Sequence, residues 1–315
     1  MGTSTPDVSV IIVNWNTRQY LLDVIDSLQA QTTVPTEIIV VDNGSQDGSQ
    51  EALRRAHPHV VLIENGENLG FAKANNIGFQ RARGRYLCLV NTDVIALDGV
   101  IDKMVAYLDA HPDVGIVGPR TLTRELTLRQ NCRRFPTLAN AAGDFLFLSR
   151  LLPGVRKFDG RTLPASSYAT THDAEVLSGC FMMVRRQAFD QVGPLDEAFF
   201  FYGEDTDWCR RFYDAGWRIV YFAEAEAIHF GGGSSKAYPV KYYLTMEKAD
   251  LIYWRKHASR PAQVGYVAIK CIYHTVCVVG WLGLAALRRD EQSRLKLRGH
   301  ATNLVWLITG RSLAG

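Results

Sequence analysis

Short apolar runs rich in β-branched residues recur along the first third of the chain, and they constrain its fold most strongly. The runs are Val8–Val13, Glu37–Val41, Val60–Glu64 and Tyr86–Val90. Continuous apolar runs of this length are typical of strands buried on both faces of a parallel sheet. The segments between them have helical spacing, which predicts helices over Tyr20–Gln31, Gln50–Ala56 and Ala72–Ala82. This alternation predicts an α/β fold with a doubly wound, Rossmann-like, mostly parallel sheet.

Polar clusters follow three of the predicted strands. They are Asn14–Asn16, Asp42–Ser45 and Asn91–Asp93. In doubly wound sheets, ligands bind beyond the carboxyl ends of the strands. We therefore expect the three clusters to converge on one crevice.

The second part of the domain has a less regular pattern. Gly115–Gly118, Val176–Arg185 and Arg218–Phe222 are strand-like, and Asp205–Ala215 reads as a helix that ends at Gly216. The polar stretch Thr121–Thr171 is interpreted as an insertion that covers the site. The predicted organisation is one domain over residues 1–235, with a first half of about 1–120 and a second half of about 121–235, followed by a tail at 236–315.

The charge is unevenly distributed between the body and the tail. The net charge of +3 combines 22 Lys/Arg and 28 Asp/Glu in residues 1–235 with 13 Lys/Arg and 4 Asp/Glu in residues 236–315. An acidic body does not favour nucleic-acid binding, whereas a basic, aromatic tail fits an anionic membrane surface. The six cysteines lack CxxC spacing, so neither a zinc cluster nor a disulfide framework is expected. The first ten residues do not have the pattern of a cleaved signal peptide.

An apolar stretch of 24 residues, Val264–Leu287, dominates the tail, but it contains Lys270 and His274. A membrane-spanning helix needs ~20 apolar residues and is disfavoured by a central lysine. A helix packed in the core, a spanning helix and a dimer interface remain alternatives. We favour an in-plane amphipathic helix that attaches the protein peripherally to an anionic leaflet.

Acidic or imidazole side chains at three places in the sequence are candidates for chemistry. Asp93 follows a strand, where a carboxylate can hold a diphosphate through a shared divalent cation. Glu204, Asp205 and Asp207 lie close together beside aromatic residues, which raises the pKa of at least one carboxyl toward the range of a general base. His229 precedes a glycine- and serine-rich segment, 231–235, whose amides can approach phosphate oxygens. Helix capping and ordinary structural roles are the alternatives for each.

Five segments, in order, resemble the motifs of family 2 inverting glycosyltransferases with the GT-A fold, in the rhamnosyltransferase-like branch. They are VSVIIVNWN, IIVVDNGSQDGS, ENLGFAKANNIGFQRARGRYLCLVNTD, LSGCFMMVRR and FFFYGEDTDWCRRFYDAGWRIVYFAEAEAIHFGGGSS. The resemblance covers residues 7–235. It implies a GT-A domain with a nucleotide-sugar half and an acceptor half, to which the tail adds a helical, membrane-associating extension.

The resemblance also implies roles for single residues. The donor-binding positions would be Val13, Asn14, Asp42, Gly70, Asn76, Asn91 and Asp93. Asp42 would hydrogen-bond the pyrimidine base, which the Val13–Asn14 backbone would flank. Asn91 stands at the first position of a DxD-like motif, where an aspartate is usual, so the site has one carboxylate fewer.

The implied mechanism is a single displacement with inversion. Asp93 and His229 would bind Mg²⁺ or Mn²⁺ against the diphosphate, and Asp205 would be the catalytic base, with Glu204 and Asp207 in support.

The resemblance implies a bacterial cell-envelope enzyme that acts on a lipid-linked saccharide at the cytoplasmic face of the inner membrane. The implied donor is dTDP-L-rhamnose. A UDP-sugar such as UDP-galactofuranose or UDP-GlcNAc is the alternative donor, and a non-catalytic nucleotide-sugar-binding protein is the alternative function. A homodimer is also compatible with the sequence, and no nucleic-acid partner is expected.

Overall fold

The structure is a computed structural model that describes residues 5–152, 154–231, 239–288 and 290–310. The chain forms two compact units, which are described separately. The sheet unit comprises Met1–Arg134, Leu163–Phe200 and Glu204–Ser234. The helical unit comprises Phe135–Thr162, Phe201–Gly203 and Ser235–Gly315. Part of the predicted insertion at Thr121–Thr171 thus groups with the C-terminal helices.

The main sheet has ten strands among the described residues, eight of them in the order β3-β2-β1-β4-β11-β6-β12-β5. These strands are β1 (Val8–Asn14), β2 (Thr36–Asp42), β3 (Val61–Glu64), β4 (Tyr86–Val90), β5 (Val94–Ala96), β6 (Val114–Leu122), β11 (Phe181–Arg185) and β12 (Arg218–His229). The first four apolar runs form the parallel part, β3-β2-β1-β4. Strand β11 lies antiparallel between β4 and β6, so the complete sheet is mixed.

Short strands complete the sheet unit. β7 (Leu128–Arg129) pairs with β6, and β9 (His172–Asp173) pairs with β12. A separate two-stranded sheet joins β8 (Cys132–Arg133) to β10 (Val176–Leu177). The predicted strand over Val176–Arg185 is therefore two strands, because the turn at Ser178–Cys180 interrupts it.

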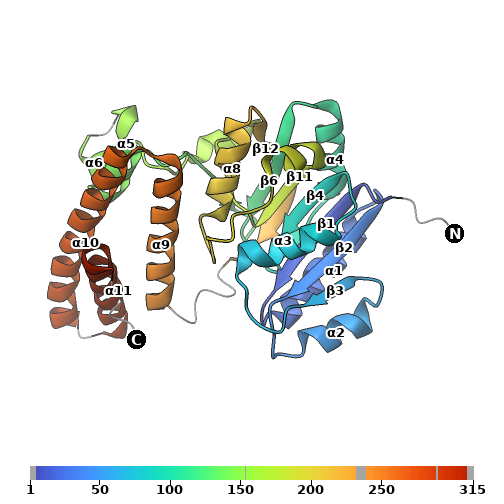
Figure 1. The fold of residues 1–315 in the computed structure, drawn as a ribbon, viewed down its shortest axis with the longest axis horizontal. Helices are drawn as coiled ribbons and strands as arrows, with labels where there is room; N and C mark the ends of the chain where they lie inside the picture. The colour runs from blue at the N-terminus through green and yellow to red at the C-terminus, as the bar shows by residue number, and fades with distance from the viewer. Residues whose placement is uncertain (1–4, 153, 232–238, 289, 311–315) are drawn as a thin grey trace. The chain divides into compact units, whose positions relative to one another are not determined.

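Helices cover both faces of the sheet, as the continuous apolar strands require (Figure 1). On one face, Leu21 of α1 (Arg18–Gln31) and Met104 of α4 (Val100–Ala110) pack with Val10 and other alternate residues of the strands. On the other face, α3 (Phe71–Arg81) packs so closely that a Cβ at its Gly78 would lie 2.5 Å from the side chain of Ile11. The remaining helices of this unit are α2 (Ser49–Ala56), α7 (Arg186–Val192), α8 (Glu204–Asp214) and the 3-10 helix at Ala165–Ala169. This two-sided cover confirms the predicted doubly wound fold class.

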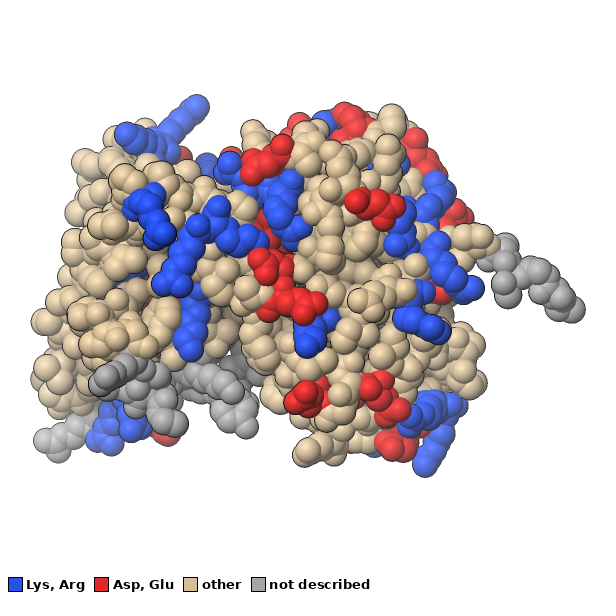
Figure 2. Space-filling view, in the orientation of Figure 1, with Lys and Arg blue, Asp and Glu red and all other residues tan. Residues whose placement is uncertain are grey.

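The helical unit is built around three long helices. Its elements are α5 (Leu138–Phe145), α6 (Leu148–Leu151), the 3-10 helix Arg156–Phe158, α9 (Pro239–His257), α10 (Arg260–Arg288) and α11 (Glu291–Thr309). The rings of Phe145 and Tyr273 pack 5.1 Å apart between α5 and α10. In Figure 2, acidic and basic side chains are mixed over the sheet unit, whereas few acidic side chains are visible on the helical unit.

The turn before α3 depends on a glycine. Gly70 has a φ of +86°, and a Cβ there would lie 2.5 Å from the carbonyl oxygen of Phe200. The next amide, of Phe71, donates to that same oxygen at 2.8 Å. This close approach ties the turn before α3 to the segment that leads to α8.

We expect Gly70→Ala to lower the free energy of unfolding by about 2–4 kcal/mol, because it adds a backbone clash to an unfavourable φ. Gly66→Ala is the matched control: its φ is +74°, with no atom within 4 Å of an added Cβ. The control should lose only about 1–2 kcal/mol. Urea denaturation of both variants measures the difference, and equal losses would contradict the close approach.

Candidate active site

The carboxyl ends of β1 and β2 hold a buried hydrogen-bonded pair, Asn14 and Asp42. The two residues are opposite each other in the parallel register. The Asn14 amide donates to Asp42 Oδ2 at 2.8 Å and to Ser45 Oγ at 3.0 Å. Asp42 Oδ1 accepts from the Ser45 backbone at 2.9 Å and from Gln50 Nε2 at 2.8 Å. The preceding residue, Val13, is half-buried, and the Asp42 carboxylate is held in one orientation at the ligand edge of the sheet.

Hydroxyl groups link this pair to the turn after β4. Thr17 Oγ1 donates to Asn14 Oδ1 at 2.8 Å and lies 2.9 Å from Thr92 Oγ1. The side chain of Asn91 is half-buried, and its backbone amide donates to the carbonyl oxygen of Cys180 at 2.9 Å. Two of the predicted clusters, Asn14–Asn16 and Asn91–Asp93, are therefore joined through Thr17. Thr17 is a contributor that sequence reasoning missed, since a lone threonine has no distinctive pattern.

Asp93 and His229 meet although 136 positions separate them in the sequence. Strand β12 runs antiparallel to β5, which places His229 opposite Val94. The His229 Nε2 atom lies 3.3 Å from Asp93 Oδ1, and the Phe230 amide donates to the Asp93 carbonyl oxygen at 2.9 Å. Topology thus creates a carboxylate–imidazole pair that spacing could not reveal.

The pair is electrostatically coupled. Burial by itself raises the pKa of Asp93, but the hydrogen bond and charge of His229 outweigh it and lower the pKa below its usual value. Burial by itself lowers the pKa of His229, but the Cys180 sulfur and Asp93 raise it to about 10. Each group thus stabilises the charged form of the other.

The donor set fits a divalent cation that is shared with a ligand. Within the described ranges, His, Cys, Asp and Glu side chains form no group of three or more that could hold a metal. Asp93 would supply one oxygen and His229, once it has lost its extra proton, one nitrogen, which would leave positions for diphosphate oxygens and water. Mg²⁺ and Mn²⁺ are commonly bound by few protein ligands together with substrate phosphates. Of the predicted phosphate-binding segment 231–235, residues 232–235 lie outside the described residues.

Arg129 supports the segment that carries His229. Its guanidinium donates to the carbonyl oxygens of His229 and Phe230, each at 3.3 Å. The Arg129 guanidinium is thus bound to backbone oxygens. It is a residue that positions the end of β12.

Asp205 reaches the same region from the N-terminus of α8. Its Oδ1 atom accepts from the Thr206 backbone at 2.6 Å, and its Oδ2 atom lies 3.4 Å from the Gly179 amide nitrogen. The next residue, Cys180, accepts the hydrogen bond from the Asn91 amide. The turn Ser178–Cys180 therefore stands between Asp205 and the Asn91–Asp93 turn and brings the two acidic clusters together. This turn lies in the LSGC motif that the sequence analysis singled out, but only the structure shows which residues it contacts.

The neighbours of Asp205 have different environments. Glu204 is buried, and its Oε2 atom has no hydrogen-bond partner. Burial, together with the negative charge of Asp205, raises the pKa of Glu204 to about 8. Asp207 is fully buried and pairs with Arg211 one helical turn later, at 3.0 Å. The desolvated carboxyl expected in this cluster is thus Glu204, whereas Asp207 contributes to the packing of α8.

The two remaining predicted donor positions shape the backbone. Gly70 permits the close turn described above, and its carbonyl oxygen accepts from the Asn43 amide at 3.1 Å. Asn76 is buried in α3, where its amide binds both the N–H and the C=O of Leu195. These contacts give Asn76 the role of fixing the loop at 195–197.

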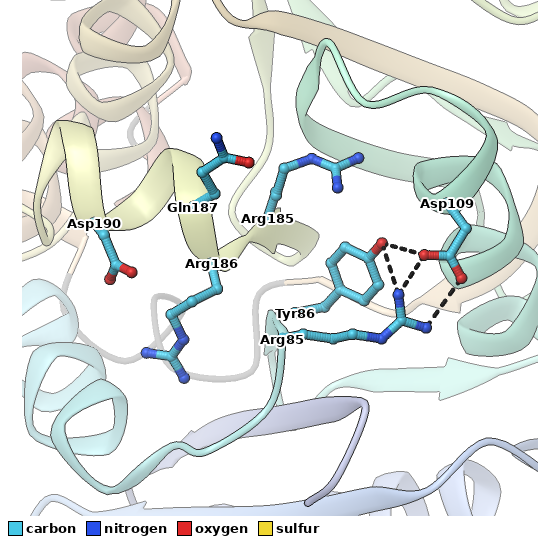
Figure 3. A pocket seen from close by; sticks show the side chains of 7 residues that line it. All are labelled: Arg85, Tyr86, Asp109, Arg185, Arg186, Gln187 and Asp190. Carbon is cyan, nitrogen blue, oxygen red and sulfur yellow. Dashed lines mark hydrogen bonds and ion pairs between the residues drawn. The ribbon is translucent and has the colours of Figure 1, made fainter.

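A separate cavity of about 480 Å³ lies at the other end of β4 (Figure 3). Its lining residues are Arg85, Tyr86, Asp109, Arg185, Arg186, Gln187 and Asp190. The arginines have structural partners: Arg85 pairs with Asp109, and Arg185 donates to the carbonyl oxygens of Leu108, His111 and Val114. This cavity is remote from the ligand edge of the sheet and is no candidate for the active site.

We expect Glu204→Gln to change how stability depends on pH. The pKa of Glu204 is raised in the folded state, so its contribution is fully present below pH 4.5 and is lost as the pH rises to about 8. The variant should therefore gain stability over the wild type at about pH 9 relative to about pH 5. Urea denaturation at both pH values measures this gain, and parallel profiles would show that Glu204 ionises normally.

The chain is similar to known proteins along most of its length. The family model for glycosyl transferase family 2 matches residues 9–193, and the model for glycosyl transferase family group 2 matches residues 156–274. The chain is 26% identical to an N-acetylglucosaminyl-diphospho-decaprenol L-rhamnosyltransferase of Mycobacterium tuberculosis, over 93% of this chain and 98% of that protein. It is 28% identical to the O-antigen biosynthesis protein RfbC of Myxococcus xanthus, over 81% of this chain and 19% of that protein.

Solved structures of glycosyltransferases share the fold. The mannosyltransferase PcManGT from Pyrobaculum calidifontis, in complex with GDP-Man and Mn²⁺, aligns with 97% of this chain and 87% of its own length, with a TM-score of 0.55 and 18% identity. GalNAc-T7 with UDP, GalNAc and Mn²⁺ aligns with 96% of this chain and 56% of its own length, with a TM-score of 0.62 and 14% identity. The predicted GT-A fold is thereby confirmed. Because the family model matches more than half of this chain, the chain belongs to glycosyl transferase family 2 and is a glycosyltransferase.

Proposed function

We propose that this glycosyltransferase is metal-dependent and inverting, and that it moves L-rhamnose from dTDP-L-rhamnose to a lipid-linked saccharide. The observation that carries the reaction is the convergence of Asp205 with the Asp93–His229 pair around the turn Ser178–Cys180. The choice of sugar and acceptor is supported by the mycobacterial relative, whose name specifies L-rhamnose and an N-acetylglucosaminyl-diphospho-decaprenol acceptor. The corresponding acceptor here is an N-acetylglucosamine unit on a lipid diphosphate.

The proposed chemistry uses Asp205 for the acceptor, and Asp42, Asp93 and His229 for the donor. Asp205 accepts the proton of the acceptor hydroxyl, whose oxygen attacks the anomeric carbon opposite the leaving nucleoside diphosphate. Asp42, held by Asn14 and Ser45, hydrogen-bonds the pyrimidine base beside the Val13–Asn14 backbone. Asp93 and His229 would hold Mg²⁺ or Mn²⁺, with Asn91 nearby. A bound divalent cation supplies charge neutralisation for the diphosphate.

The proposed location is the cytoplasmic face of the bacterial inner membrane, in cell-envelope polysaccharide synthesis. A lipid-linked acceptor is confined to a bilayer, so an enzyme that uses it must work at that surface. The basic tail, with 13 Lys/Arg and 4 Asp/Glu in residues 236–315, supports peripheral attachment to anionic lipid.

We expect Asp205→Asn to reduce transfer by ~10²–10⁴-fold, because the amide cannot accept the proton. Donor affinity should change little, since Asp205 contacts the acceptor. The matched control is Asp214→Asn at the other end of α8, where Asp214 pairs with Arg210 at 2.9 Å. Product formation and donor binding are measured for both variants. A parallel loss of donor binding and transfer in Asp205→Asn would assign that residue a structural role.

Calorimetric titration tests the donor and the metal. We expect dTDP-L-rhamnose to bind in Mg²⁺ or Mn²⁺ and to lose most of its affinity in EDTA, because no divalent cation then neutralises the diphosphate charge. UDP-galactofuranose and UDP-GlcNAc are titrated in parallel. Tighter binding of a UDP-sugar would retain the enzyme class and discard rhamnose, whereas undiminished binding in EDTA would contradict metal dependence.

A further inference from the structure

Helix α10 buries polar side chains and exposes apolar ones, which is the reverse of the pattern in a helix of a water-soluble protein. Its buried residues are Tyr266, Lys270 and His274, all of which carry polar groups. A surface helix normally turns its apolar face inward and its polar face to solvent. Among the described residues, α10 is the helix long and apolar enough to cross a membrane, yet only 11% of its most apolar window is buried. It is therefore not an ordinary core helix.

The outward stripe of α10 consists of large aliphatic side chains. Its members are Val264, Ile272, Val276, Val279, Leu282 and Leu287, which are 53–83% exposed. Their helical spacing places them on the side of α10 opposite Tyr266, Lys270 and His274. The left margin of Figure 2, where Figure 1 shows α10, is correspondingly tan. A continuous apolar surface of this kind marks an interaction site.

The buried face is held in place by an ionic network. The Glu247 Oε2 atom of α9 accepts from Lys270 Nζ and lies near His274 Nε2, both at 3.0 Å. On the other side, His274 Nδ1 lies 3.0 Å from Nδ1 of His300 in α11. The Lys270 ammonium also lies 4.0 Å above the ring of Phe145. Rotating α10 to bury the stripe would leave Glu247 buried and unpaired, which is strongly unfavourable.

The cationic side chains around the stripe indicate what kind of surface it binds. Arg260 and Arg288 are exposed at the two ends of α10, and Arg294 and Arg298 are exposed on α11. The Lys296 ammonium lies 4.5 Å above the Trp281 ring, a pairing of cation and indole suited to the membrane interface. An apolar stripe bordered by cations complements an anionic lipid surface.

The network also determines how α10 meets lipid. If α10 crossed the bilayer alone, Lys270 would enter hydrocarbon without Glu247. If it crossed with its neighbours, it would carry Lys248 and Asp250 of α9 and Arg294 of α11 into the membrane. Both arrangements are costly, whereas an in-plane helix immerses the stripe and leaves the network intact.

We propose that the outward stripe of α10 is the membrane-docking surface of this protein, lying in the plane of an anionic bilayer. The inference deepens the proposed function, on whose lipid-borne acceptor it rests. It specifies which face enters the lipid and excludes a spanning arrangement.

The test is cosedimentation of the full-length protein with vesicles of phosphatidylcholine and phosphatidylglycerol. We expect Ile272→Ser, Val276→Ser and Val279→Ser together to weaken binding by at least ~10-fold, because they remove apolar area from the interface. Leu126→Ser is the matched control, since Leu126 is an aliphatic side chain of the sheet unit that is 63% exposed. Unchanged binding by the triple variant would overturn the proposal.

Two substitutions of opposite charge at one exposed position separate an effect on lipid binding from an effect on folding. Val279→Asp should weaken binding to the anionic vesicles, whereas Val279→Lys should preserve most of it. If both changes instead converted a lipid-free dimer into a monomer, as measured by light scattering, the stripe would be an interface between copies and the proposal would be wrong. Retention of the wild type on vesicles after an alkaline carbonate wash would indicate a spanning helix and would also overturn it.

Titration with dTDP-L-rhamnose separates this inference from the proposed function. The stripe variants should bind the nucleotide sugar as the wild type does, because their substitutions lie in the helical unit. Lost vesicle binding with normal nucleotide binding supports the docking surface. Normal vesicle binding by the wild type without any nucleotide-sugar binding would refute the proposed donor and leave the docking surface intact.

Discussion

The turn Ser178–Cys180 is the constraint on which the candidate active site depends. Its Cys180 carbonyl accepts from the Asn91 amide, and its Gly179 amide lies 3.4 Å from Asp205 Oδ2. The turn interrupts what would otherwise be one strand, so β11 can pair antiparallel with β4 while the chain before it passes beside α8. Asp205 on its helix and the Asp93–His229 pair at the sheet edge are thereby held by one short segment.

Several polar groups of the site are held by hydrogen bonds within the protein. The Asp42 carboxylate accepts from Asn14, Ser45 and Gln50, and the carbonyls of His229 and Phe230 accept from Arg129. Such support fixes side chains before a ligand arrives, which is the basis of electrostatic preorganisation. Glu204 is the exception, a buried carboxyl with an oxygen that has no hydrogen-bond partner. Burial and the negative charge of Asp205 raise its pKa to about 8.

The two units differ in which side chains they bury and which they expose. In the sheet unit, Val10, Ile12 and Val40 are removed from water by helices on both faces. In α10, Lys270 and His274 are buried and Val276 is exposed. The same physical rule explains both arrangements, because buried charges are paired and the outer surface matches its surroundings.

Local patterns determined the fold class and the chemical candidates. The apolar runs from Val8 to Val90 specified strands buried on both faces, and the motifs around Asp42, Asp93 and Asp205 indicated the glycosyltransferase family, because both signals reside in neighbouring residues. The tertiary structure alone decided that Asp93 meets His229, that Asn76 binds the Leu195 backbone and that Lys270 faces Glu247. These contacts join residues far apart in the sequence, so they depend on strand order and helix rotation, which no local periodicity encodes.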